Sequence, residues 1–268
     1  MDEILVNQNG NIATVTINRP EVKNAVTSKM WDDLTAIFAK LGYDDSVRAV
    51  IVTGAGDDFC SGADVSAMGK DENAVKLHQL EAMRKVGDCC LSLFNMPKVT
   101  IARVPGIAVG AGMNMALSCD LVVASVNARF SEIFAKRGLS VDFGGSYLLP
   151  RIVGLQKAKE LVLLADVISA SEADRMGIVN YVVDPEELDA KVNEIAEKAS
   201  AGPPRALAMS KALLNRSFSN SLTDALEQEG TAQTFNFTTK DISEAMRAFK
   251  EKRTVSYTHL TLPTTMWV

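Results

Sequence analysis

A single carboxylate stands in an apolar stretch of this chain, where few acids are expected. In "RGLSVDFGGSYLLPR", residues 137–151, Asp142 lies between Val141 and Phe143 and is followed by two glycines. An apolar environment disfavours the charged form of an acid, which raises its pKa toward the range useful for moving protons. Asp is also a favoured N-cap, so Asp142 could instead begin the helix expected after the glycines. These residues alone leave both roles open.

Other residue types that commonly do chemistry are scarce or badly spaced. The chain has two histidines, His78 and His259, and four cysteines without the spacing of a metal site or disulfide framework. The G-x-S-x-G elbow, the G-x-x-x-x-G-K-[ST] loop and a G-x-G-x-x-G turn opening a helix are absent from the sequence. We therefore expect no metal site, and chemistry carried by carboxylates and backbone groups.

Two loops of small residues follow segments that look like buried strands. They are "GAGDDFCSGADV", residues 54–65, and "GIAVGAGMNMAL", residues 106–117. Gly and Ala let backbone N–H groups approach a ligand closely, and the first N–H groups of a helix lack internal partners. One N–H from each loop could converge on an oxyanion and stabilise an enolate or a tetrahedral intermediate. The alternative is that the small residues only permit tight packing of strands against helices.

Strands and helices that could position these residues alternate up to about residue 183. "ILVNQNGNIATVTINRP" predicts two strands around an Asn-Gly turn, and "RAVIVTGAG", "KVTIARVPG" and "CDLVVASV" are typical of buried strands. Ser28 is expected to cap a first helix, and a longer helix is expected over residues 73–94, with Leu80, Met83, Val86 and Cys90 inward.

After Asp184-Pro185 the pattern is helical, with helices expected over residues 186–199, 205–216, 221–235 and 242–252. An α/β body followed by helices is the simplest architecture. We expect a core over residues 1–200, a helical C-terminal region over 201–253, and a tail over 254–268 that is disordered or non-native.

Composition limits the classes of partner. The 268 residues carry a formal charge of −5 without any run of Lys and Arg, so nucleic-acid binding is not expected. The sequence has no apolar run near the roughly 20 residues that cross a bilayer, and "MDEILVNQNG" is not a signal peptide. These features predict a cytoplasmic protein without membrane contacts.

Four motifs in register resemble the crotonase, or enoyl-CoA hydratase/isomerase, superfamily. They are "NRPEVKNAV", "FCSGADVSAM", "VPGIAVGAGMNMALSCDLVVAS" and "FSEIFAKRGLSVDFGGSYLLPRIVG", and the resemblance runs from about Ile4 to Arg253. It implies an α/β fold, a ClpP-like spiral of ββα units with an α-helical C-terminal trimerisation region. It also implies a homotrimer or a dimer of trimers, an acyl-CoA thioester substrate, and coenzyme A only as part of that substrate, with no permanently bound cofactor.

The resemblance also implies roles for individual residues. It places the oxyanion-binding N–H groups at Ala63 and Ala111. It places contacts with the substrate and its CoA moiety at Val22, Lys23, Ala25, Ser61, Gly62, Asp64, Val65, Gly110, Asn114 and Phe134.

This chain departs from the family's hydratases at the two glutamates that activate water. Asn114 and Phe134 stand there, and neither moves a proton near neutral pH. Glu132 is two residues from Phe134 but does not match the family's position. Asp142 resembles the catalytic aspartate of a branch that includes the ring-epoxide isomerase of phenylacetyl-CoA catabolism and some Δ3,Δ2-enoyl-CoA isomerases.

The sequence therefore predicts an enoyl-CoA isomerase in which Asp142 is the single acid/base and the enolate occupies an oxyanion hole. One alternative is an enoyl-CoA hydratase of fatty-acid or aromatic-acid degradation, with Asn114 positioning the water. Another, from a different class, is an acyl-CoA-binding protein without turnover.

Overall fold

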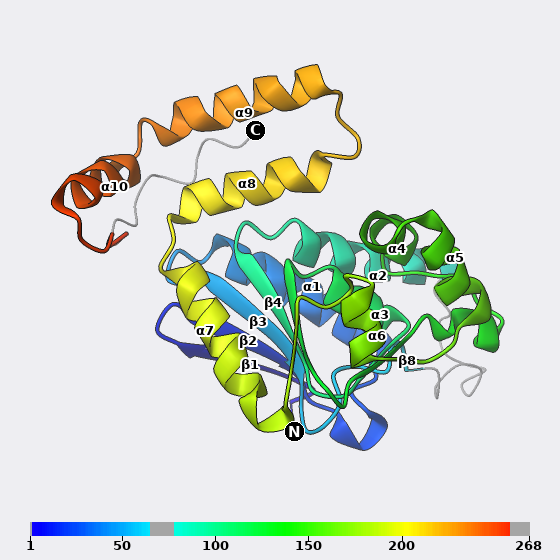
Figure 1. The fold of residues 1–268 in the computed structure, drawn as a ribbon. Coiled ribbons are helices and arrows are strands. Elements are labelled where there is room, and N and C mark those ends of the chain that lie inside the picture. The colour runs from blue at the N-terminus through cyan, green and yellow to red at the C-terminus, as the bar shows by residue number, and fades with distance from the viewer. Residues whose placement is uncertain (1, 65–77, 258–268) are drawn as a thin grey trace.

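The computed structural model describes residues 2–64 and 78–257, and its main element is a twisted sheet (Figure 1). Within these ranges six strands pair in the order β1-β2-β3-β4-β6-β9, with β1 antiparallel to β2 and the later pairs parallel. Their bounds are β1 Ile4–Asn9, β2 Ile12–Ile17, β3 Ala49–Gly54, β4 Val99–Val104, β6 Leu121–Ser125 and β9 Tyr181–Val183.

Helices cover both faces of this sheet, as the buried strand patterns require. All six residues of β3 are buried. On one face β2 and β3 pack against α1 (Ser28–Tyr43) and α2 (Gln79–Phe94). On the other face β3, β4 and β6 pack against α7 (Leu188–Ser200), which crosses in front of the sheet in Figure 1. The predicted strands after residues 48, 97 and 119 are thereby confirmed.

A smaller sheet carries the second small-residue loop. Among the described residues it consists of β5 (Ile107–Val109), β7 (Arg129–Ser131) and β8 (Ile168–Ser169), with β7 in the middle. An isolated bridge between Cys60 and Ala108 joins it to the loop after β3. The first loop is therefore held beside the second.

Short helices connect these strands and surround the end of the body that holds both loops. They are η1 Pro20–Val22, α3 Ala111–Leu117, η3 Ile133–Arg137, α4 Gly145–Val153, α5 Leu155–Leu164, α6 Ala170–Arg175 and η4 Pro185–Glu187.

The C-terminal helices α8 (Pro204–Arg216), α9 (Leu222–Asn236) and α10 (Lys240–Glu251) lie outside the layered body (Figure 1). Lys211 of α8 anchors them through an ion pair with Asp120, at 2.8 Å. The predicted α/β class with a helical C-terminal region is confirmed. The division into segments at residues 200 and 253 stays a prediction, and residues 258–268 of the expected tail lie outside the described residues.

Two details of the helices differ from the sequence predictions. The N-cap of α1 is Thr27 rather than Ser28, and its hydroxyl accepts a hydrogen bond from the N–H of Met30. Leu80 and Met83 of α2 are exposed, although Val86 and Cys90 are buried as expected. Helical periodicity at the start of α2 therefore does not imply a buried face.

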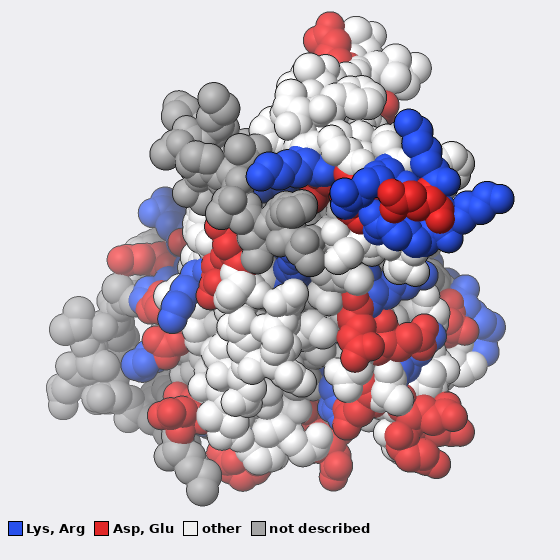
Figure 2. Space-filling view, turned by 90° about the vertical axis from the view of Figure 1, so that its left-hand side faces the viewer, with Lys and Arg blue, Asp and Glu red and all other residues white. Residues whose placement is uncertain are grey.

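The surface carries both signs of charge. On the face shown in Figure 2, acidic and basic side chains of the described residues are interspersed. Within residues 2–64 and 78–257, no helix is both long and apolar enough to cross a bilayer.

Candidate active site

The segment 22–25 is held against the loop after β3 by a buried amide. Lys23 and Asn24 have φ of 53° and 57°, in the left-handed region that Asn tolerates better than most residues. The Asn24 side chain is fully buried and donates to the carbonyls of Ala55 and Asp58, at 2.9 and 2.7 Å. Asn24 thus fixes the relative position of two segments that lie thirty residues apart.

The two predicted CoA-binding segments lie side by side. The N–H of Ser61 donates to Lys23 O at 3.0 Å, and its hydroxyl donates to Val22 O at 3.2 Å. Val26 N–H donates to Gly62 O at 2.9 Å. The structure therefore brings residues 22–25 and 61–64 together, while Val65 lies outside the described residues.

The N–H of Ala63 faces away from this pairing. In the bridge between Val26 and Ala63, Gly62 O accepts from Val26 and Asp64 N–H donates to Val26, so the Ala63 N–H takes no part in it. The carboxylate of Asp64 forms an ion pair with Arg19 at 2.9 Å, which holds the loop beyond Ala63. Ala63 is therefore free to direct its N–H toward the second loop.

The second loop approaches the first with its backbone. Ala111 is the first residue of α3, where an N–H has no partner inside the helix. A Cβ placed on Gly62 would lie 3.5 Å from Ala111 N, and one on Gly112 would lie 2.1 Å from Cys60 O. Only glycine fits at residue 112, and Gly62 leaves open the space in front of the Ala111 N–H. The two predicted oxyanion donors come from loops in direct contact.

Asp142 does not cap α4. The N-cap position is Gly144, with φ of 75° and no side-chain hydrogen bond, and the Gly145 N–H donates to the backbone oxygen of Asp142 at 3.0 Å. Phe143, between them, has φ of 47° and is buried against Trp31, with ring centroids 5.5 Å apart. Left-handed φ at a bulky residue is strained and persists only where packing holds it. This strained turn directs the Asp142 side chain away from the helix end.

The Asp142 carboxyl lies in an environment that favours its protonated form. Oδ1 is buried, and no described residue gives it a hydrogen bond. Burial raises the pKa of Asp142 to about 6. On α2 the buried thiol of Cys90 faces the same turn and donates to Phe143 O at 3.5 Å. A carboxyl with this pKa can both take and return a proton near neutral pH.

A second buried acid, Glu132, is linked to the Asp142 backbone through Asn114. Glu132 is 1% exposed, and its Oε2 accepts a hydrogen bond from Asn114 Nδ2 at 3.3 Å. The same Nδ2 donates to the backbone oxygen of Asp142 at 2.9 Å. Burial raises the pKa of Glu132 to about 7, with a further contribution from the charge of Asp142. The sequence signal that could have found Glu132 is an acid between Ser131 of β7 and Phe134 of η3, both of which are buried.

Phe134 fills the space beside the second loop. Its ring is buried, and Cζ would lie 3.5 Å from a Cβ placed on Gly110. The N–H of Gly110 donates to Ser131 O at 2.8 Å, which fixes β5 beside β7. An apolar ring thus lies directly beside the residue that precedes the Ala111 N–H.

Comparison with known proteins identifies the family. The model of the enoyl-CoA hydratase/isomerase family matches residues 7–259 of this chain. The chain belongs to the enoyl-CoA hydratase/isomerase family. This family lies in the crotonase superfamily, as the four motifs predicted.

Relatives with different names match nearly the whole chain. A short-chain-enoyl-CoA hydratase of Clostridium acetobutylicum is 38% identical, over 95% of this chain and 97% of the relative. A 1,2-epoxyphenylacetyl-CoA isomerase of Escherichia coli is 32% identical, over 96% and 99%. The crystal structure of an enoyl-CoA hydratase of Mycobacterium smegmatis superposes with a TM-score of 0.90 at 32% identity, covering 96% of this chain and 99% of that one. These names span hydration and isomerisation.

In this member of the enoyl-CoA hydratase/isomerase family, Asp142 and Glu132 are the acids that Asn114 links among the described residues, through the Asp142 backbone and the Glu132 carboxyl. Among the described residues, no group of three or more His, Cys, Asp or Glu side chains could hold a metal ion.

Proposed function

We propose that this protein moves the double bond of an enoyl-CoA thioester from the 3- to the 2-position, with Asp142 as the acid/base. The thioester oxygen would accept hydrogen bonds from the N–H groups of Ala63 and Ala111. Asp142 would take a proton from C2, leaving a dienolate in which the negative charge is held at the thioester oxygen. The same carboxyl would then return the proton to C4.

The observation that carries this proposal is the Asp142 carboxyl, which is buried and has an unpartnered Oδ1 and a pKa raised to about 6. At a pH equal to this pKa, the Asp142 carboxyl is ionised in half of the protein molecules. The group can therefore act as a base in the first proton transfer and as an acid in the second. A side chain that only capped a helix would be bonded to backbone N–H groups. The cap of α4 lacks such a bond.

The backbone donors support an enolate rather than a simple binding site. N–H groups fixed before the reaction stabilise an oxyanion without reorganisation, and removing one such donor typically costs about 10²–10³ in kcat. Here Ala63 is fixed by the Val26 bridge, and Ala111 by the contact of Gly112 with Cys60. Coenzyme A would enter as part of the substrate along residues 22–25 and 61–64, and no permanently bound cofactor is required by this chemistry.

Two substitutions disfavour ordinary hydration. Asn114 cannot act as a general base, and Phe134 is an apolar ring beside Gly110. Water addition needs one group to take a proton from water and another to deliver one to C2. The positions that serve this purpose in family hydratases hold neither.

Enoyl-CoA hydration remains the second candidate function because of Glu132. Asn114 Nδ2 donates to the Glu132 carboxyl and to the backbone oxygen of Asp142, and Asn114 Oδ1 is buried without a partner among the described residues. A water bound there would have two acids beside it. Several relatives, including the one from Clostridium acetobutylicum, carry the name hydratase.

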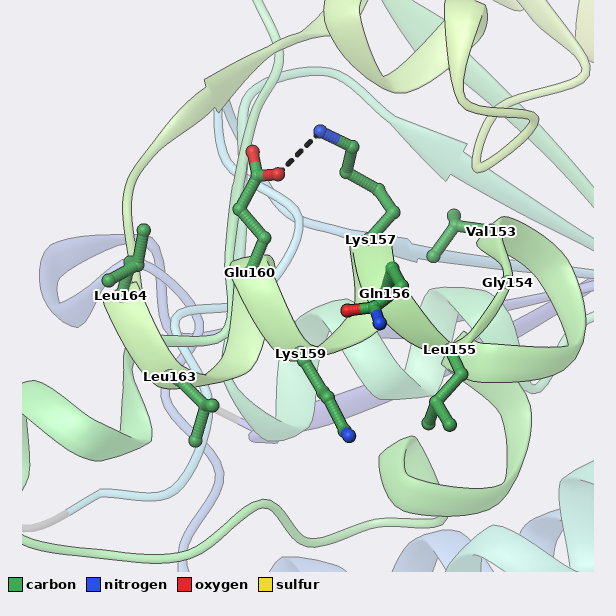
Figure 3. Close-up of a pocket in the computed structure, with 9 residues that line it drawn as sticks. All are labelled: Val153, Gly154, Leu155, Gln156, Lys157, Lys159, Glu160, Leu163 and Leu164. Atoms are coloured by element: carbon green, nitrogen blue, oxygen red, sulfur yellow. Dashed lines mark hydrogen bonds and ion pairs between the residues drawn. The ribbon is translucent and has the colours of Figure 1, made fainter.

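We also propose a homotrimer or a dimer of trimers as the working assembly. Large apolar side chains are exposed along the C-terminal helices and the turns between them, at Leu214, Phe218, Leu222, Leu226, Phe237, Met246 and Phe249. On α5, Leu155, Leu163 and Leu164 are exposed as well, and Leu155 and Leu163 point away from the ion pair of Lys157 and Glu160 (Figure 3). Such surfaces on one chain are typical of subunit interfaces.

The test is conversion of a 3-enoyl-CoA and a 2-enoyl-CoA by the wild type, with the product position determined by NMR. Isomerisation should dominate, and Asp142→Asn should lower kcat by a factor on the order of 10²–10⁴ with little change in thioester binding. Water addition faster than isomerisation would select the hydratase. Binding without conversion would select a non-catalytic acyl-CoA-binding protein.

A further inference from the structure

The turn that carries Asp142 is attached to helix α3 by the side-chain amide of Asn114. Asn114 is fully buried, and its Nδ2 donates to the backbone oxygen of Asp142 at 2.9 Å. The same Nδ2 donates to Glu132 Oε2 at 3.3 Å. Both partners are acceptors, so the amide must present its nitrogen to them rather than its oxygen. Glu132 therefore helps to hold the amide in the orientation that reaches the turn.

Gly145 makes room for this amide. A Cβ placed on Gly145 would lie 2.6 Å from Asn114 Oδ1 and closer still to Nδ2, so a side chain at residue 145 would displace the amide. The Gly145 N–H donates to the same Asp142 oxygen at 3.0 Å. That oxygen thus accepts one hydrogen bond from inside the turn and one from α3. The second of these bonds joins the turn to another element.

The backbone of Asn114 is itself held in place within α3. Its N–H donates to Gly110 O at 3.0 Å, and its carbonyl oxygen accepts from the Ser118 hydroxyl at 2.8 Å. Ala111, the proposed oxyanion donor, is the first residue of the same helix. α3 therefore carries the oxyanion donor at its start and, through Asn114, holds the turn of the proposed base.

We propose that Asn114 is a positioning residue, which sets the distance between the Asp142 carboxyl and the oxyanion donor of Ala111. C2 of a thioester is bonded to the carbonyl carbon, so a base that takes the C2 proton must lie at a fixed distance from the oxyanion hole. A displacement of about 1 Å can cost about 10²-fold in rate. The effect of Asn114 on rate rests on the proposed isomerase function, whereas its attachment of the turn does not.

The kinetic test is Asn114→Leu, which keeps nearly the same shape and removes the donor. We expect kcat for double-bond migration to fall about 10²-fold, with little change in the affinity for a saturated acyl-CoA measured by calorimetry. Gly145→Ala, which keeps Asn114 but displaces its amide, should lower kcat in the same way. An unchanged kcat in either folded variant would overturn the proposal.

A double variant tests whether Asn114 acts through Asp142. In Asp142→Asn no base is left to be positioned, so adding Asn114→Leu should not lower the residual rate further. A loss as large as in the wild-type background would overturn the proposal, because Asn114 would then act directly on the substrate or on a water.

The matched control is Asn215→Ala. Asn215 Nδ2 also donates to a backbone oxygen of another helix, Phe94 O at 3.0 Å, where α8 meets the end of α2. Asn215→Ala should lower the melting temperature and leave kcat unchanged. A loss of kcat equal to that of Asn114→Leu would overturn the proposal, because any lost amide bond would then impair turnover.

Hydrogen exchange without substrate separates this inference from the proposed isomerase activity. Mass spectrometry of peptides that contain Gly145 should show exchange about fivefold to tenfold faster in Asn114→Leu than in the wild type, and unchanged exchange in Asn215→Ala. If exchange rises as expected and the wild type moves no double bond, the proposed function fails and the attachment of the turn by Asn114 stands. Unchanged exchange in Asn114→Leu refutes the attachment whatever the enzyme catalyses.

Discussion

Asp142→Asn should make this protein more stable near neutral pH while it removes the proposed base. Folding raises the pKa of Asp142 from 3.8 to about 6 because burial disfavours its charge. The folded state therefore binds a proton more tightly than the unfolded state does. Between about pH 4 and pH 6 the native form holds the extra proton, so its stability falls as pH rises through this range.

The size of the effect follows from that difference in pKa. A difference of about two, at about 1.4 kcal/mol for each pKa unit, gives an upper value of about 3 kcal/mol lost from the free energy of unfolding above pH 6. Partial solvent access to the carboxyl reduces this, so we expect about 1–2 kcal/mol. Asn is neutral at every pH and avoids the loss.

Thermal melts of wild type and Asp142→Asn across pH 4 to 8 measure this directly. The variant should melt higher above pH 6, and the gap should close toward pH 4, where the wild-type carboxyl is protonated in both states. Asp166→Asn is the control, because the carboxylate of Asp166 is exposed and pairs with Lys136 at 3.2 Å. A melting temperature that is lower for Asp142→Asn at every pH would mean that the carboxylate is bonded and stabilising, and would refute burial as the cause of its pKa.

Four further outcomes follow from the same structure. Gly62→Ala should lower kcat by about 10²-fold in steady-state assays. Residue 62 has φ of 94°, and a Cβ there would lie 3.5 Å from Ala111 N. An unchanged kcat would refute the place of Gly62 beside the oxyanion donors. Asn114→Glu, alone or with Phe134→Glu, should introduce measurable hydration of a 2-enoyl-CoA. It should also lower stability by about 1–3 kcal/mol, because the backbone at Gly145 leaves no room for a longer side chain at residue 114. A folded double variant that binds CoA esters and adds no water would contradict the roles given to these positions. Light scattering should find a trimer or hexamer, and a compact monomer would contradict the proposed assembly. Removal of residues 256–268 should leave assembly and turnover intact. A truncated protein that fails to fold would contradict the expectation that this tail is dispensable.

The sequence by itself determined the order of elements and the identity of the family. Buried strands show as short apolar β-branched runs, as in "AVIVTG", and helices as periodic apolar faces, because each pattern depends only on neighbours along the chain. The small residues of the two loops could be recognised for the same reason. Even locally, Leu80 and Met83 show the limit of this inference: they follow a helical period and are nevertheless exposed.

Tertiary structure alone excluded Asp142 as the N-cap of α4. Its local sequence fits an N-cap, and an isolated segment would have no reason to reject that role. Packing of Phe143 on Trp31, more than a hundred residues earlier in the chain, holds the turn in a left-handed conformation, and Gly144 becomes the cap instead. The strain that directs the carboxyl away from the helix is supported by a contact that no local pattern contains.

The same holds for Glu132, whose place in the site was not predicted. Asn114 of α3 donates both to the Glu132 carboxyl and to the backbone oxygen of Asp142. Glu132 directly precedes η3, and Asp142 lies in the turn before α4. Sequence determined which groups can carry a proton. Only the fold determined that Glu132 and Asp142 are both buried around Asn114, and burial is the main cause that raises the pKa of each.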